Sequence, residues 1–166
     1  MIALRRILVA TDFGETSTAA LRYGVDLARR FHAQVYLFHA IDQLGETAEA
    51  AYPIGLSETM RNAAHDRLRH LLSSDDLRHV EPLCAMRLGV AADEIVRYAD
   101  DSNIDLIVMG THGREGVARA LMGSVAEQVV RRATCPVLTV HHAECQVVAN
   151  HFVANHWVGV GVPAAA

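Results

Sequence analysis

The sequence predicts an α/β protein with a single doubly wound, five-stranded parallel sheet of the Rossmann-like kind. Short apolar runs alternate with segments of helical periodicity along residues 1–141. Strict alternation favours parallel strands with helices on both faces, joined by right-handed crossovers. The two most unusual loops follow the first and fourth runs. In the strand order 3-2-1-4-5 these runs are neighbours, so both loops would face one crevice where the winding reverses.

The predicted strands are short and apolar. They span residues 5–11, 34–40, 79–86, 105–110 and 135–141. The third is the weakest, because Pro82 cannot donate a ladder hydrogen bond, and this favours a sheet edge. The fourth, DLIVMG, is the most apolar and leads directly into the glycine-rich loop.

Four helices are predicted between these strands. In the first, apolar residues recur with helical spacing from Ala20 to Phe31, and Thr16 or Ser17 can cap its start. A loop over residues 42–55 precedes the second, which passes through Met60, Ala64, Leu68, Leu71 and Leu72. The last two helices span residues 90–101 and 124–133.

Composition excludes several classes of function. With 51% hydrophobic residues the chain is not disordered throughout, and no apolar run is long enough to cross a membrane. The apolar stretch at the N-terminus is too short for a signal peptide, so a cytoplasmic location is expected. A net charge of -4 argues against general nucleic-acid binding. Cys84, Cys135 and Cys145 are scattered, which indicates neither a disulfide framework nor a zinc site.

The chain contains no lysine, so its 15 basic residues are all arginine. A Walker-type phosphate lysine, a Schiff-base lysine and a lysine general base are therefore excluded within this sequence. Any anion site must use backbone N–H groups, hydroxyl groups or arginine side chains.

The loop GTHGREGVARALMGS, residues 110–124, is the strongest local signal. Gly110 and Gly113 can adopt positive φ and present successive N–H groups to an anion. Gly123 and Ser124 then open a helix, whose free N–H groups and dipole favour a phosphate. Neither the Walker pattern nor G-x-G-x-x-G is present.

Each candidate residue also has a structural interpretation. Ser124 with Glu127 fits an ordinary capping box, and Asp12 could cap the turn into the first helix as readily as it could contact a ribose hydroxyl. His112 fits an ordinary loop histidine better than a catalytic one. Arg114 and Arg119 are either solvated loop charges or phosphate partners.

The motif set resembles the universal stress protein family, in particular its ATP-binding members. The signature G-x2-G-x9-G-[ST] matches residues 110–124, and ILVATDFGETS, LFHAID and CPVLTVH resemble the first strand with its aspartate turn, the second-strand end and the closing strand. This resemblance implies that Asp12 contacts ribose and that the backbone near Ala40 and Ile41 meets adenine. It further implies that ribose and phosphates are surrounded by Met109, Gly110, His112, Gly113, Gly123, Ser124 and Val125. The predicted nucleotide-binding set also includes Ala10, Thr11 and Arg114.

Two positions depart from the family pattern. Gly14 stands where serine is frequent, which removes a hydroxyl near the phosphates, and Ala40 stands where valine is frequent, which reduces apolar contact with the base. Both changes bear on affinity rather than on the mode of binding.

The leading hypothesis is an ATP-binding stress-response regulatory module with little or slow hydrolysis, with Mg²⁺ or Mn²⁺ assisting at the phosphates. The alternatives are a slow ATPase or nucleotidyl hydrolase in the same pocket, and an interaction protein whose pocket stays empty. A homodimer through the last strand, residues 136–141, is expected because an apolar edge strand invites pairing. Residues 142–166, with the repeat VANHF–VANHW, are expected to be a C-terminal extension after the nucleotide-binding domain of residues 1–141.

Overall fold

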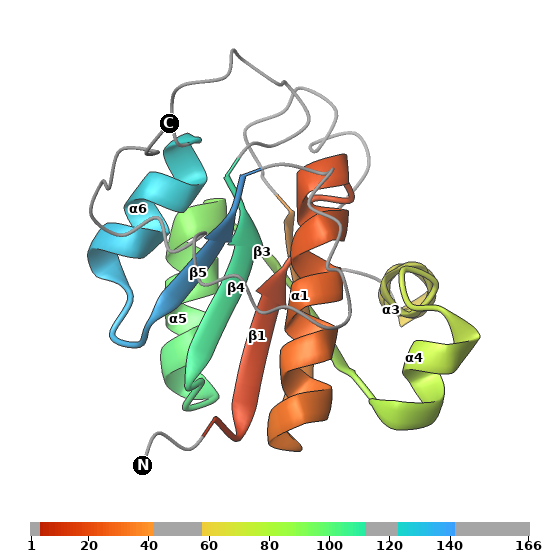
Figure 1. Cartoon of the computed structure of the whole chain (residues 1–166). Coiled ribbons are helices and arrows are strands. Elements are labelled where there is room, and N and C mark those ends of the chain that lie inside the picture. The colour runs from red at the N-terminus through yellow and green to blue at the C-terminus, as the bar shows by residue number, and fades with distance from the viewer. Residues whose placement is uncertain (1–3, 42–57, 112–122, 142–166) are drawn as a thin grey trace.

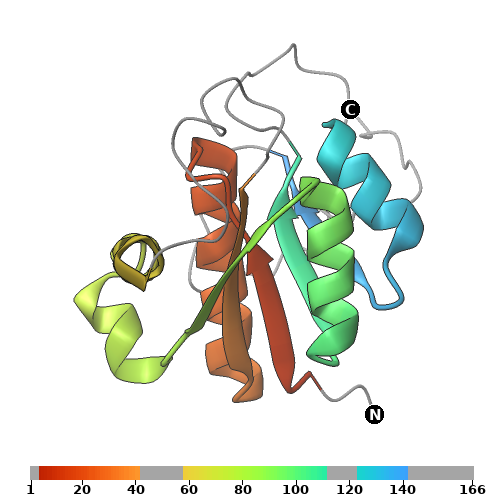
Figure 2. The same cartoon turned by 180° about the vertical axis from the view of Figure 1, so that it is seen from behind.

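The computed structural model describes residues 4–41, 58–111 and 123–141. These residues form a five-stranded parallel sheet in the order β3-β2-β1-β4-β5, which confirms the predicted fold class. The elements are β1 (Arg6–Ala10), α1 (Glu15–Phe31), β2 (Gln34–Ile41), α3 (Glu58–Arg69), α4 (Ser74–His79), β3 (Leu83–Leu88), α5 (Ala91–Asp101), β4 (Leu106–Gly110), α6 (Ser124–Arg132) and β5 (Val137–Val140). Figures 1 and 2 show α1 on one face of the sheet and α5 on the other.

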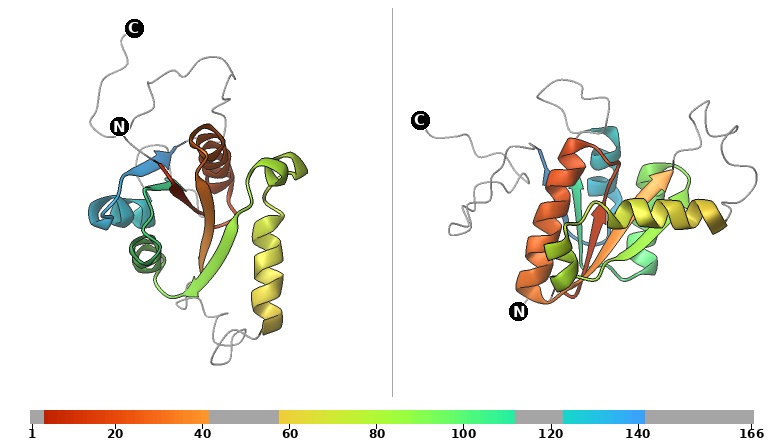
Figure 3. Two further views of the ribbon diagram at one scale, coloured as in Figure 1. Left: turned by 90° about the horizontal axis from the view of Figure 1, so that it is seen from below. Right: turned by 90° about the vertical axis from the view of Figure 1, so that its right-hand side faces the viewer.

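Two apolar cores lie on opposite faces of the sheet. Along β1 the side chains alternate, so that Ile7 and Val9 join the core under α1, and Leu8 and Ala10 join the core under α5 and α6. Leu68 of α3 packs with the α1 core. Figure 3 shows α3 and α4 beside the β3 edge, away from α5 and α6. The central strands are thus covered on both faces, as the uninterrupted apolar runs predict.

Helix α1 packs unusually close to β1. A Cβ atom built on Gly24 would lie 2.4 Å from Cγ2 of Val9, a side chain with no solvent exposure. The glycine therefore brings the helix backbone down onto the sheet.

The third strand begins later than predicted. β3 starts at Leu83, and part of the range 79–86 belongs instead to the short helix α4, which the sequence pattern did not indicate. The cause is a capping box: the Ser73 hydroxyl accepts from the Asp76 N–H, and the Asp76 carboxylate accepts from the Ser73 N–H. The edge position inferred from Pro82 is confirmed.

In the part of the chain that the structure describes, no helix is long and apolar enough to span a bilayer.

Candidate functional site

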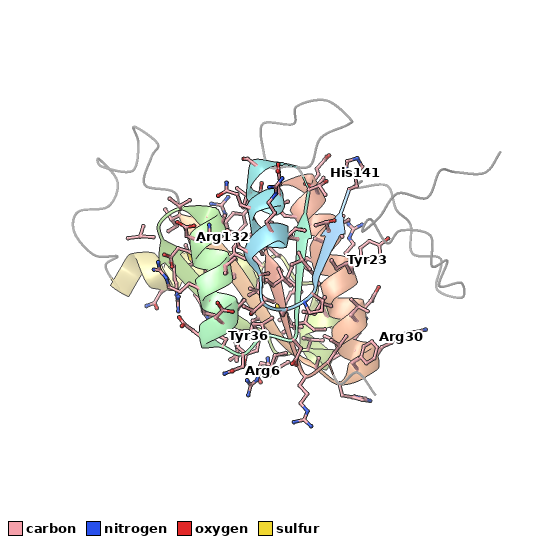
Figure 4. The ribbon with its side chains drawn as sticks, turned by 90° about the vertical axis from the view of Figure 1, so that its left-hand side faces the viewer. Arg6, Tyr23, Arg30, Tyr36, Arg132 and His141 are labelled. Atoms are coloured by element: carbon pink, nitrogen blue, oxygen red, sulfur yellow. The ribbon has the colours of Figure 1, made fainter. Side chains whose placement is uncertain are left out.

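The carboxyl ends of β1 and β4 lie side by side at one edge of the sheet. Ala10 and Met109 are register partners, and the chain beyond β1 stays attached to β2 through the Thr11 N–H, which donates to the Phe38 carbonyl at 2.9 Å. In Figure 4, Arg6 at the start of β1 and His141 after the end of β5 mark opposite ends of the sheet. The aspartate turn and the start of the glycine loop therefore lie together at the carboxyl ends of β1 and β4, where the strand order predicts a crevice.

Gly110 is required by the close approach of α1. A Cβ atom at this position would lie 2.9 Å from the Thr16 carbonyl carbon and 3.0 Å from the Ser17 nitrogen, both of them backbone atoms. The expectation that Gly110 adopts positive φ is wrong. Among the described residues, the glycine with positive φ is Gly89 and not Gly110. The glycine thus serves to bring the first turn of α1 against the end of β4.

Thr111, at the end of β4, is hydrogen-bonded both to the end of β5 and to the start of α6. Its N–H donates to the Val140 carbonyl at 2.9 Å, and its carbonyl accepts from the Gly123 N–H at 2.6 Å. Its hydroxyl lies 2.9 Å from Nδ1 of His141. The two ends of the glycine loop therefore meet beside the end of β5, while the predicted contacts His112, Gly113 and Arg114 lie outside the described residues.

Helix α6 begins without a side-chain cap among the described residues. Its N-cap is Gly123, with φ -58° and ψ 148°, and Ser124 is its first helical residue. The capping-box interpretation of Ser124 and Glu127 is wrong, since Glu127 instead pairs with Arg131 one turn later, at 2.8 Å. The first-turn N–H groups of α6 are therefore left without a side-chain cap from the described residues. Ser124 is exposed there, whereas the half-buried Val125 packs against the core under α5 and α6.

Asp12 closes a turn after β1. Its Oδ1 accepts from the Gly14 N–H at 2.9 Å, so the capping role anticipated for this carboxylate is present. Its Oδ2 takes no hydrogen bond from the described part of the chain, and the residue as a whole is half-buried. A Cβ at Gly14 would sit 3.1 Å from Oδ1, so the glycine leaves room for this turn.

The structure adds residues that the sequence analysis did not single out. The ring of Phe13, whose φ is 66°, lies 4.6 Å from the His39 ring and 4.0 Å below the Arg67 guanidinium. His39 also places Nδ1 2.7 Å from the Thr11 carbonyl oxygen. The one sequence feature that could have indicated this cluster is a histidine within the otherwise mostly apolar strand QVYLFHAI.

The end of β2 presents backbone groups to the crevice. Phe38 directs its carbonyl to Thr11, on the β1 side, and Ile41 directs its carbonyl to Gly89, on the β3 side, at 3.0 Å. Backbone groups alternate along a strand, so the N–H and carbonyl of Ala40 point toward the β1 side. Because β1 ends at Ala10, these groups of Ala40 lie beyond its ladder, at the crevice.

Among the residues that the structure describes, no group of three or more histidine, cysteine or acidic side chains could hold a metal ion. Cys84 and Cys135 are free, and burial raises the pKa of both thiols, which disfavours the reactive thiolate.

The structure is a doubly wound α/β protein in which two helix N-termini, backbone groups and one carboxylate come together at the ends of β1 and β4. A family model described as the universal stress protein family matches residues 3–141, and the chain belongs to this family.

Relatives and solved structures agree with this assignment. Universal stress protein MJ0531 of Methanocaldococcus jannaschii is 35% identical over 139 residues, which cover 82% of this chain and 81% of that protein. A solved structure of hypothetical protein MJ0577 from the same organism has a TM-score of 0.68 at 26% identity and covers 85% of this chain and 98% of that one. A universal stress protein solved in complex with cAMP has a TM-score of 0.56 at 26% identity, covering 84% and 98%.

Proposed function

We propose that the protein is an ATP-binding regulatory module of the stress response, with the nucleotide held at the crevice between β1 and β4. The observation that supports this most directly is the uncapped start of α6, tied to the end of β4 by the Gly123–Thr111 hydrogen bond of 2.6 Å. Free N–H groups and the helix dipole favour a phosphate at such a point. Nucleotide binding by the cAMP-bound relative supports the same class of ligand.

The remaining groups match a nucleoside. The Oδ2 atom of Asp12 would accept from a ribose hydroxyl, because the Gly14 N–H already occupies Oδ1. Ala40 offers a backbone N–H and carbonyl of the kind that pairs with the polar edge of adenine. Members of the predicted contact set from all four segments (Ala10–Asp12, Ala40–Ile41, Met109–Gly110 and Gly123–Val125) thus line one edge of the sheet.

A divalent cation fits this arrangement. Mg²⁺ and Mn²⁺ prefer oxygen ligands, and the Ser124 hydroxyl is exposed at the start of α6, where the phosphates would lie. When bound, the ion would supply charge neutralisation at the phosphates. Ser124 would contribute one ligand, and phosphate oxygens and water the others.

The first test is nucleotide binding by the wild-type chain and by Asp12→Ala. We expect ATP to be released from the purified protein by acid, and Asp12→Ala to weaken ATP binding about tenfold or more, the usual effect of losing a hydrogen bond to a charged group. Isothermal titration with ATP, cAMP and AMP measures this. As control, Asp26→Ala removes an exposed carboxylate from α1, away from the crevice, and should leave affinity unchanged.

The same samples test the alternative function, a slow ATPase or nucleotidyl hydrolase. Efficient phosphoryl transfer needs a clamp on the transferring group and a placed base or water-orienting residue. The chain has no lysine, and Gly14 holds one oxygen of Asp12. Phosphate release should therefore stay far below about 10 s⁻¹, a typical enzyme turnover. Ordinary turnover that is lost in His112→Ala would contradict the binding-module proposal.

The module is also proposed to be a homodimer through β5. Pro136 and Val140 direct their carbonyls to β4, so by alternation Val137 and Thr139 direct their N–H groups to the open edge of the sheet. β5 is the last strand of the order, and its outer ladder is unpaired among the described residues. Such an edge favours strand pairing about a two-fold axis.

Two proline variants separate dimerisation from folding. Val137→Pro removes an N–H that faces outward, so we expect a folded monomer at micromolar concentration. Leu138→Pro removes an N–H that faces β4, and we expect loss of stability as well. Light scattering and thermal unfolding measure the two effects. A wild-type monomer, or a Val137→Pro variant with unchanged mass, would count against pairing through β5.

A further inference from the structure

We infer that His39 is a positioning residue for the nucleotide site, which sets the orientation of the Asp12 carboxylate and thereby the selectivity for ribose hydroxyls. This inference rests on the proposed nucleotide function. It concerns a side chain that lies behind the turn rather than in contact with the ligand.

The first observation is a hydrogen bond to the residue before Asp12. Nδ1 of His39 lies 2.7 Å from the Thr11 carbonyl oxygen, which can only accept, so Nδ1 carries the proton. The Thr11 N–H is held separately by the Phe38 carbonyl at 2.9 Å. The backbone entering the Asp12 peptide is therefore held on both sides by β2.

The second observation is a ring contact to the residue after Asp12. Phe13 has φ 66°, a left-handed conformation that is rare for a bulky side chain and needs support from its surroundings. Its ring centroid lies 4.6 Å from that of His39, at 58° between the planes, and Arg67 covers it at 4.0 Å. The Phe13 N–H donates to the Thr11 hydroxyl at 3.0 Å.

His39 thus contacts both neighbours of Asp12, through a hydrogen bond on one side and a ring on the other. The resulting turn brings the Gly14 N–H onto Oδ1 of Asp12 at 2.9 Å, which leaves Oδ2 as the acceptor for a ligand. Without the imidazole, the Thr11 carbonyl would lose this donor and Phe13 would lose one side of its support. The carboxylate would then sample several orientations, and a hydrogen bond to ribose would lose its geometric advantage.

The test compares ATP with 2′,3′-dideoxy-ATP, which lacks both ribose hydroxyls. We expect the wild-type chain to prefer ATP at least about tenfold, the lower range for a hydrogen bond to a charged group. His39→Phe keeps a ring against Phe13 but removes the donor, and the preference should fall below about threefold, with dideoxy-ATP affinity unchanged within about twofold. His39→Asn retains an N–H near the Nδ1 position and should keep most of the preference.

A matched control is available on α4. Nδ1 of the exposed His79 lies 2.9 Å from the Asp75 carbonyl oxygen, so His79→Phe removes the same kind of bond away from the site and should leave both affinities unchanged. Circular dichroism checks that each variant is folded.

The possible failures are distinguishable. A wild-type chain that binds neither nucleotide overturns the proposed function together with this inference. A wild-type chain that prefers ATP, with a His39→Phe variant that keeps the preference, overturns the positioning role alone. Equal weakening of both nucleotides in His39→Phe and His39→Asn would indicate a merely structural histidine, and would also overturn it.

Discussion

Gly110→Val should abolish nucleotide binding and lower the free energy of unfolding by about 1–3 kcal/mol, the usual range for overpacking a close contact. A Cβ at this position would meet the Thr16 carbonyl carbon at 2.9 Å and the Ser17 nitrogen at 3.0 Å. Both atoms belong to the backbone of α1, so no side-chain rotation relieves the contact. The first turn of α1 would have to move away from β4, and Asp12 lies on the chain that leads into that turn.

Chemical denaturation and titration with ATP measure the two effects of this change. Ala40→Val is the control, because it adds the same branched side chain at the end of β2, on the other side of β1 from β4. Valine is frequent at this position in the family that the sequence resembles. It should fold and bind ATP. A Gly110→Val variant with wild-type affinity would show that the spacing between β4 and α1 does not matter to the site.

Gly24→Ala should destabilise the protein by about 1–3 kcal/mol, against the trend for helices, in which alanine is favoured over glycine by about 1 kcal/mol. The added Cβ would lie 2.4 Å from Cγ2 of Val9. Val9 has no exposed surface, so its side chain has no space into which to rotate, and α1 must lift from β1.

Whether Gly24→Ala lowers or raises the stability of the protein tests the close packing of α1 on β1. Thermal or denaturant unfolding of Gly24→Ala is compared with that of Asp26→Ala, which replaces an exposed residue on the same helix and should be neutral or stabilising. A Gly24→Ala variant more stable than wild type would mean that α1 lies farther from the sheet than the structure places it.

The fold was predictable because the same pattern, an apolar run followed by a helical segment, recurs along residues 1–141. Each strand is an apolar run between helical segments, and one strand order places the two unusual loops together. The errors arose where a local capping contact competes with the pattern. The capping box of Ser73 and Asp76 starts α4, which takes His79 from the predicted strand, and Gly123 rather than Ser124 occupies the N-cap position of α6. Such contacts depend on backbone geometry that side-chain periodicity does not encode.

The strand order made it predictable that the aspartate turn and the glycine loop start at the same edge of the sheet, but the contacts around them were not predictable. Asp12 and the glycine loop were identified from their place after strands 1 and 4. The role of Gly110 was misjudged, because a glycine needed for positive φ and one needed for close packing look the same in a sequence. The contacts of His39 with Thr11 and Phe13 join residues on different strands and turns, so they became visible only in three dimensions.

The hydrogen bond between Thr111 and Gly123 bears on how the sequence between these two residues can evolve. It joins the two ends of the segment 112–122 at 2.6 Å, and Thr111 is held in turn by Val140 at 2.9 Å. The entropy cost of closing a loop grows slowly with its length, by about 0.6 kcal/mol for each doubling. Insertions and deletions between these two residues therefore cost little folding free energy, and a descendant chain can vary this segment while it inherits the sheet unchanged.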